Sequence, residues 1–125
     1  MNISRNFLML GTVLLICGVA IGMHMGPSAD YTFKPLHVHL NLLGFTLMSV
    51  FALVYKVFDA MSANVLARVH FWLHCVGSVV LLAGLFLMLK KAASEAVLGP
   101  IFMLSELAIL IGLLLFLWNT YKNAN

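Results

Sequence analysis

The chain consists of four long apolar runs separated by short polar stretches. The runs cover about residues 7–25, 36–58, 66–89 and 100–118, and an α-helix needs about 20 apolar residues to cross a bilayer. The prolines and most of the charged residues lie in the connections or near the ends of the runs. The pattern predicts an all-α fold, in which residues 1–125 form a single four-span transmembrane domain, an integral membrane four-helix bundle with up-down-up-down topology.

Composition agrees with this pattern. The chain is 63% hydrophobic and 9% charged, with a mean hydropathy of +1.07, whereas about a quarter of the residues in soluble domains are charged. The net charge of +3 is not concentrated in a basic cluster, so we expect membrane lipid and not nucleic acid as a partner.

The charged residues at the ends of the runs give a weak orientation. Both termini are expected to be cytoplasmic, because the side of the membrane that carries them then holds the larger number of basic residues. We expect the first run to remain as a span and not to be a signal peptide, because it continues to Met25. The four residues on the cytoplasmic side are Arg5, Lys56, Arg68 and Lys122, and the three outside are Lys34, Lys90 and Lys91.

Neither cysteine suggests a disulfide or a covalent haem. Cys17 and Cys75 both lie within apolar runs, where a solitary cysteine is usually a packing residue. The sequence has no CxxCH motif, which excludes covalently attached c-type haem.

The stretch HVHLNLLGF, residues 37–45, is the main candidate for chemistry. Imidazole is the commonest protein ligand for iron, copper and zinc, and ionisable groups within spans usually have a function. The predicted topology places His24, Met25 and Glu106 on the same side of the membrane as His37 and His39. These five residues are therefore the expected metal ligands.

The two histidines of this stretch cannot share one role. A separation of two residues rotates their side chains to nearly opposite sides of a helix. His37 shares its face with Asn41 and Gly44, and Gly44 either leaves a gap for a flat macrocycle or allows close helix packing. His39 lies on the other face.

A second histidine pair, His70 and His74, lies on one face of the third span. It is expected near the cytoplasmic end, well separated in depth from His37. We interpret His70 as an interfacial residue beside Arg68 and Trp72. The alternative is an inner haem or metal site whose second ligand comes from another copy of the chain.

Glycines in the first span recur at Gly18, Gly22 and Gly26 and form one stripe. Such a stripe allows another helix to approach closely. We expect packing within the chain, and a homo-oligomer contact is the alternative.

The segments LHVHLNLLGF, FALVYKVFDA and LARVHFWLHCVGSVVLLAGL resemble small four-span bacterial membrane proteins related to subunit I of the haem-copper oxidases and nitric oxide reductases. The resemblance implies b-type haem (heme b) in a bacterial inner membrane, with His37 or His39 as the iron ligand. The paired-histidine and copper motifs of the large subunit are missing, as is its second axial histidine. Oxygen reduction is therefore not expected.

Three functions remain open at this stage. The leading hypothesis is a membrane b-type cytochrome, or haem-binding protein, for electron transfer or haem or gas sensing, with a respiratory redox partner. Its second ligand would come from His24 or from a homo-oligomer. The alternatives are a haem-free copper or zinc protein in respiratory metal handling, and a structural or assembly protein. We assign no catalytic residue and do not expect an enzyme.

Overall fold

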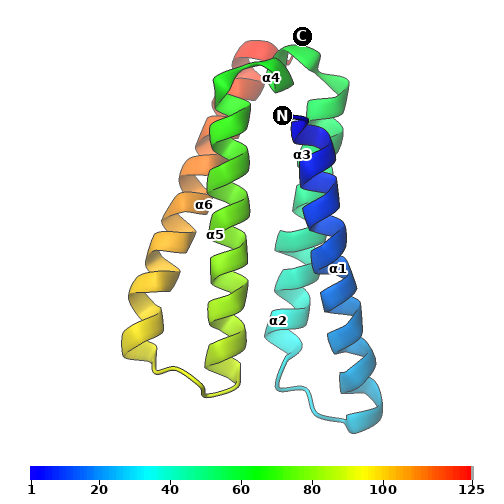
Figure 1. Cartoon of the computed structure of the whole chain (residues 1–125), viewed down its shortest axis with the longest axis vertical. Coiled ribbons are helices and arrows are strands. Elements are labelled where there is room, and N and C mark those ends of the chain that lie inside the picture. The colour runs from blue at the N-terminus through cyan, green and yellow to red at the C-terminus, as the bar shows by residue number, and fades with distance from the viewer. Residues whose placement is uncertain (125) are drawn as a thin grey trace.

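The computed structural model describes residues 1–124, which fold into helices with no strand in that range (Figure 1). The all-α, four-helix prediction is confirmed, since four helical segments are long and apolar enough to cross a membrane. Both termini lie at the same end of the molecule (Figure 1). In chain order the elements are α1 (Ile3–Ser28), α2 (Lys34–His39), the π-helix η1 (Leu40–Thr46), α3 (Leu47–Val57), α4 (Asp59–Ala63), α5 (Val65–Leu89) and α6 (Glu95–Asn123).

The second span is one continuous helix made of α2, η1 and α3. Its middle part is a π-helix, in which each backbone bond closes a wider turn than in an α-helix. The Thr46 hydroxyl donates to the Asn41 carbonyl oxygen at 2.9 Å within this segment. Residues 40–46 therefore point in directions around the helix axis that differ from those of a regular α-helix.

Local capping sets two of the helix starts. The Asn2 side chain accepts from the Arg5 backbone N–H at 3.0 Å, and Asn64 accepts from Ala67 N–H at 3.3 Å, which satisfies donors that have no partner within the helix. The outer helices extend beyond the expected spans, since α1 continues past Pro27 and α6 begins before Pro100. A proline near a helix end interrupts only one backbone bond, so the helix can include it.

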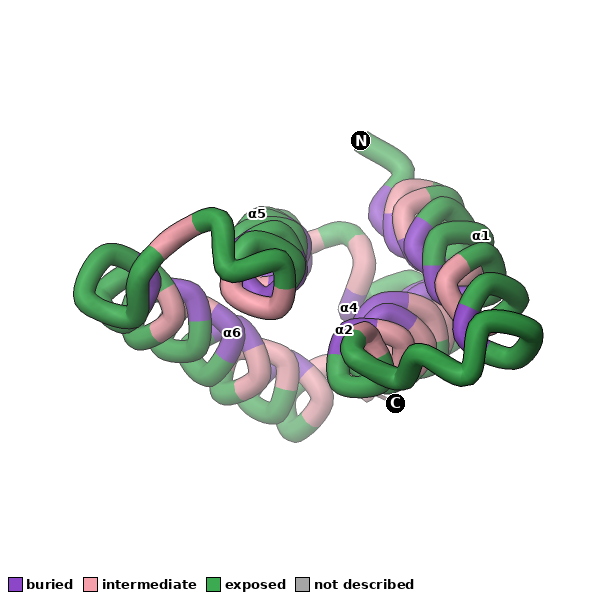
Figure 2. Tube along the Cα trace, turned by 90° about the horizontal axis from the view of Figure 1, so that it is seen from below, coloured by how far each residue is buried: buried purple, intermediate pink, exposed green. Residues whose placement is uncertain are grey.

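The helices form two hairpins. One consists of α1 packed along α2, η1 and α3, and the other of α5 packed along α6. Seen along the bundle, these are two separate pairs, with α5 on the side of its pair that faces the first hairpin (Figure 2). Contacts within each hairpin far outnumber those between the two. The backbones of the two hairpins therefore approach each other less closely than the helices within each hairpin do.

Glycines allow the close packing in the first hairpin. A Cβ on Gly44 would lie 2.9 Å from Leu14 Cβ, and one on Gly22 would lie 2.9 Å from His37 Cε1. The Asn41 side chain occupies the space beside Gly18 in the same way. The expected packing within the chain is therefore found at Gly18 and Gly22, and it extends to the second span at Gly44.

Glycines also fix the second hairpin. A Cβ on Gly77 would lie 2.9 Å from the Ser105 carbonyl oxygen, and one on Gly84 would lie 2.7 Å from Phe102 Cε1. From the other side, Gly112 brings α6 close to the His70 ring, with 3.4 Å between the added Cβ and Cδ2. Each hairpin thus has its own seam of small residues.

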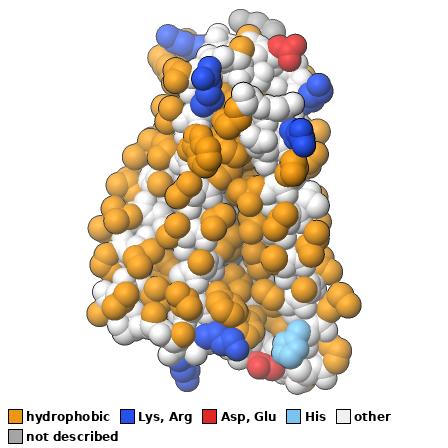
Figure 3. All heavy atoms as spheres, viewed as in Figure 1, with side chains coloured by type: hydrophobic (Ala, Val, Ile, Leu, Met, Phe, Trp, Pro, Cys, Tyr) orange, Lys and Arg blue, Asp and Glu red, His pale blue; other side chains and the backbone are white. Residues whose placement is uncertain are grey.

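The surface matches a protein that spans a bilayer. Basic residues gather at the two ends of the molecule and hydrophobic side chains cover the middle (Figure 3). Trp118 and Tyr121 stack at 5.9 Å near the end of α6, and Lys122 Nζ lies 4.7 Å from the Trp118 ring. Aromatic and basic residues of this kind are typical of the membrane–water interface.

Candidate metal centre: a buried histidine pair

His37 lies within the first hairpin and already has protein partners. Its Nδ1 donates to the Gly18 carbonyl oxygen at 2.7 Å. The Asn41 amide nitrogen lies 3.2 Å from its Nε2. Nδ1 therefore bonds the second span to α1, whereas Nε2 faces Asn41 one turn further along its own span. Asn41 Oδ1 is buried without a partner among residues 1–124.

The other expected ligands do not join His37. The side chains of His24, His39 and Glu106 are exposed, and Met25 is buried in the core. No three His, Cys, Asp or Glu side chains in the described part of the chain come together as a metal-binding group. The expected convergence is wrong because His24, His39 and Glu106 are exposed on three separate helices. His39 Nδ1 bonds its own helix at the Pro35 carbonyl oxygen, 2.8 Å away.

Gly44 does not leave room for a flat macrocycle. The Leu14 side chain occupies the space beside it, with three carbon atoms 2.9 to 3.5 Å from the position of an added Cβ. Of the two roles that the sequence left open for this glycine, the structure supports close helix packing.

The second histidine pair lies in the interior. His70 and His74 are both 0% exposed. The interpretation of His70 as an interfacial residue is therefore wrong. Both residues lie on the side of α5 that packs against the first hairpin, whereas Trp72, between them in sequence, faces outward and is 59% exposed.

Aromatic rings from three other helices surround the pair. The His70 ring centroid lies 5.2 Å from Phe7, 4.5 Å from Phe51 and 5.2 Å from Phe116. Phe51 also contacts His74 at 4.9 Å with the ring planes nearly perpendicular. Residues of α1, α3, α5 and α6 therefore meet at this point, and the two imidazoles are the polar centre of an apolar cage.

Tyr55 connects the pair to the first hairpin. Its hydroxyl oxygen lies 2.9 Å from Nδ1 of His70. If Nδ1 donates this bond, Nε2 of His70 is left with a free lone pair, which is the arrangement of a histidine that binds a metal.

A polar pocket of about 290 Å³ at the end of the molecule that carries the termini is lined by Tyr55 together with Lys56 and Asp59.

Three of the four nitrogens in the two rings have no hydrogen bond within residues 1–124. They are Nε2 of His70 and both nitrogens of His74, and the Ser78 hydroxyl one turn further along α5 is in the same condition. A buried polar group without a partner costs about 1–3 kcal/mol, so this pair is the most polar point of the protein interior and the candidate ligand site. The four acidic residues of the chain, Asp30, Asp59, Glu95 and Glu106, are all exposed, whereas the histidine pair is fully buried.

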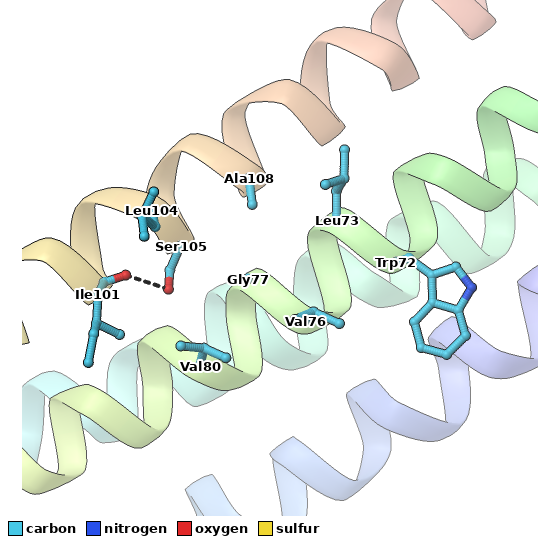
Figure 4. Close-up of a pocket in the computed structure, with 9 residues that line it drawn as sticks. All are labelled: Trp72, Leu73, Val76, Gly77, Val80, Ile101, Leu104, Ser105 and Ala108. Carbon is cyan, nitrogen blue, oxygen red and sulfur yellow. Dashed lines mark hydrogen bonds between the residues drawn. The ribbon is translucent and has the colours of Figure 1, made fainter.

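An apolar groove lies elsewhere on the surface. It has a volume of about 460 Å³ and runs between α5 and α6, with Trp72, Val76 and Leu104 among its lining residues (Figure 4). Its one hydroxyl, on Ser105, donates to the Ile101 carbonyl oxygen at 2.8 Å. The groove is apolar and open to the side, which suits lipid chains, and the histidine pair does not line it.

Sequence reasoning missed Tyr55 and the phenylalanines of the cage. Phe51 and Tyr55 are four residues apart, so a common helical face could have been read from the spacing. The contact of that face with His70 and His74 could not have been predicted from the sequence, because it depends on how the two hairpins pack.

No protein-family model, curated protein or solved structure matches this chain. The resemblance to the haem-copper oxidases stays a prediction.

Proposed function

We propose that the protein binds a b-type haem between its two hairpins and serves in electron transfer in a bacterial inner membrane. The observation that carries this proposal is the set of three imidazole nitrogens in His70 and His74 that are buried without a partner among residues 1–124. This assignment moves the ligand from His37 and His39 to the other end of the bundle.

Charge favours haem over a bare divalent ion. A doubly charged cation in an apolar interior is costly unless negative groups accompany it, and the cage around His70 and His74 consists of phenylalanines and Tyr55. The porphyrin ring brings its own two negative charges, so ferrous haem adds no net charge at the iron. When bound, this group supplies a reversible one-electron couple.

The two histidines have separate tasks. Residues four apart on one helix project from the same side, so they cannot approach opposite faces of one iron. His70, whose Nδ1 is held by Tyr55 at 2.9 Å, is the better oriented ligand, and His74 provides a polar group within the cage. A second protein ligand would have to come from another residue or from a second copy of the chain.

A flat group could enter this interior only if the two hairpins moved apart, because aromatic rings fill the space around both imidazoles. The hairpins hold themselves together through their own glycine seams and make fewer contacts with each other. Phe7 and Phe51 would have to rotate away from the imidazoles, and the apolar cage would then exclude water from the iron. Tyr55 would keep the His70 ring in one orientation throughout.

A copper ion without haem is the second candidate. The centroids of the His70 and His74 rings are 5.7 Å apart. At this separation the two rings could together hold one small metal ion. Singly charged Cu(I), which accepts imidazole ligands, is the form that this uncharged cage would tolerate best.

Absorption spectroscopy of the detergent-solubilised protein tests the proposal. Haem gives a Soret band, and a reduced α band appears after dithionite. Both should be lost in His70→Ala and strongly altered in His74→Ala. The matched controls are His39→Ala and His24→Ala, whose exposed side chains lie outside the cage, and these should retain the spectrum.

Elemental analysis of the same samples separates the outcomes. Stoichiometric copper without a Soret band, lost in both cage variants, would replace haem by copper. Loss of haem in His39→Ala with retention in His70→Ala would refute the assigned ligand. A colourless protein without metal, folded normally in excess chelator, would refute both candidates and leave a structural or assembly role.

A further inference from the structure

A pocket lies between the two hairpins at the end of the molecule opposite the termini, where α1 and α5 finish (Figure 1). Its volume of about 370 Å³ is within the range of about 300–1,000 Å³ that is usual for small-molecule sites. Both helices and the connection between α1 and α2 contribute to its wall. The lining residues are Ala20, Ile21 and His24 of α1, Phe33 of the connection, Phe86 of α5, and Lys90 directly after α5.

The pocket has the same order of side chains on both helices. His24 lies four residues after Ala20, and Lys90 lies four residues after Phe86. The Lys90 backbone N–H still bonds the Phe86 carbonyl oxygen at 3.0 Å, so the helical spacing reaches this residue. Residues four apart share a face of a helix and are separated by about 6 Å along its axis. Both walls are therefore apolar towards the middle of the span and carry a nitrogen group about one turn further out.

Two aromatic rings join the hairpins across the pocket. The Phe33 and Phe86 ring centroids are 5.7 Å apart, with the ring planes at 20° to each other. Lys90 Nζ lies 5.7 Å from the Phe33 ring centroid, and the face of an aromatic ring attracts a cation at this distance. Phe86 is 41% exposed, so part of this aromatic surface is free to contact a ligand.

This end of the molecule carries more positive than negative charge, and its charged side chains lie close together with a histidine (Figure 3). The charged residues are Lys34, Lys90, Lys91, Asp30 and Glu95, three positive and two negative. Neither acidic residue is among those that line the pocket. The Asp30 carboxylate already accepts two hydrogen bonds from Thr32. The mouth of the pocket therefore attracts an anion.

We infer that this pocket binds the headgroup of an anionic phospholipid, with His24 and Lys90 donating to its phosphate oxygens. Lys90 directly follows the last residue of α5, so these nitrogen groups lie at the height of the lipid headgroups. The lipid chains run along Ala20, Ile21 and Phe86 towards the middle of the span. A soluble anion would gain nothing from these apolar walls, and a zwitterionic lipid would bring a further cation to a positively charged mouth.

Native mass spectrometry of the detergent-solubilised full chain tests this inference. The protein is titrated with phosphatidylglycerol or with phosphatidylcholine that has the same acyl chains, and the Kd of the first bound lipid is determined. Phosphatidylglycerol should bind more tightly. Lys90→Gln should weaken its binding about fivefold, which corresponds to the roughly 1 kcal/mol that one basic residue contributes beside anionic lipid. The double variant His24→Leu/Lys90→Gln should lose the preference for phosphatidylglycerol.

Lys91→Gln is the matched control, because it removes the same charge one residue away from the lining of the pocket. It should keep most of the preference. His24 and Lys90 are exposed, so their variants should retain the fold, which circular dichroism checks.

Three results would overturn the inference. They are equal affinity for the two lipids, equal weakening by Lys90→Gln and Lys91→Gln, and displacement of phosphatidylglycerol by excess inorganic phosphate, which would assign the pocket to a soluble anion. The measurement needs no cofactor, so its outcome is independent of the proposal for His70 and His74.

Discussion

The Tyr55 hydroxyl and Nδ1 of His70 lie 2.9 Å apart, although the two residues belong to different hairpins. Tyr55 is on α3 and His70 is on α5, and both side chains are almost completely buried. This bond fixes the second hairpin against the first at the level of the aromatic cage.

Replacing Tyr55 by phenylalanine removes this bond and leaves Nδ1 of His70 without its partner. We expect Tyr55→Phe to destabilise the protein by about 1–3 kcal/mol, measured by thermal unfolding in detergent. The control is Tyr121→Phe, because Tyr121 is 79% exposed. Equal stability of the two variants would show that the bond does not hold the hairpins together.

Alanine substitutions should divide the glycines into two classes. Gly44→Ala and Gly77→Ala place a methyl group 2.9 Å from Leu14 Cβ and from the Ser105 carbonyl oxygen, and overpacking of this kind costs about 1–3 kcal/mol. Gly26 and Gly99 have no such neighbour within 4 Å among the described residues.

Gly26→Ala and Gly99→Ala should therefore be neutral or slightly stabilising, since alanine favours a helix over glycine by up to about 1 kcal/mol. Unfolding midpoints of all four variants, determined in one detergent, check the division. If all four variants unfold alike, the glycine seams do not determine the packing of the hairpins.

Replacing His74 by leucine should stabilise the protein when it is prepared without a cofactor. The change removes two buried ring nitrogens that have no partner among residues 1–124, and such groups cost about 1–3 kcal/mol each when unsatisfied. The same variant should have a lower cofactor content. A site for a ligand often lowers the stability of the empty protein in this way.

Thermal unfolding of the cofactor-free proteins, together with their absorption spectra after addition of haem, tests this prediction. His39→Leu is the control, because the His39 ring is exposed and bonds to its own helix. A large destabilisation by His74→Leu would mean that the His74 ring makes stabilising hydrogen bonds in the cofactor-free protein, and would contradict the prediction.

The connection between α1 and α2 contains an acid that should titrate unusually low. The Thr32 hydroxyl donates to Asp30 Oδ1 at 2.6 Å and the Thr32 N–H donates to it at 3.0 Å, and these bonds lower the pKa of Asp30 from its ordinary value of 3.8. The lowered pKa stabilises this turn at all pH values above the ordinary one. The contribution is lost as the pH falls through the lowered pKa.

Carboxyl carbon chemical shifts of Asp30, followed by NMR over the acidic range, measure this pKa. In Thr32→Val the hydroxyl is missing, so the pKa should move up towards the ordinary value. The Asp59 carboxyl of the same protein serves as the internal reference. An unchanged titration in Thr32→Val would exclude the hydroxyl as the main cause.

The apolar runs and the helical spacing were enough to predict the four helices and the common face of His37, Asn41 and Gly44. Each of these features depends on one helix or on the contact between neighbours in the chain. The burial of His70 depends also on how the two hairpins pack against each other. Its neighbours Arg68 and Trp72 suggested an interface, but the rotation of α5 turns those two side chains outward and His70 inward.

Glu106 shows a second limit of sequence reasoning. Apart from Ser105, the residues around it on α6 are apolar or glycine, so the sequence has no polar face that would tell which side of the helix is turned outward. The orientation is set by the small residues Ser105 and Gly112, which pack against α5. Glu106 thereby lies outside the bundle, away from the histidines with which it was expected to bind a metal.

Because the two glycine seams lie within the hairpins, the molecule behaves as two modules joined at α4. The two helices of each module would insert into the bilayer and pack against each other before the two modules meet. A gene cut within the codons for residues 59–64 should therefore yield two fragments that reassemble when they are produced together. The same division would let one half be exchanged or duplicated over evolutionary time without disturbing the internal packing of the other.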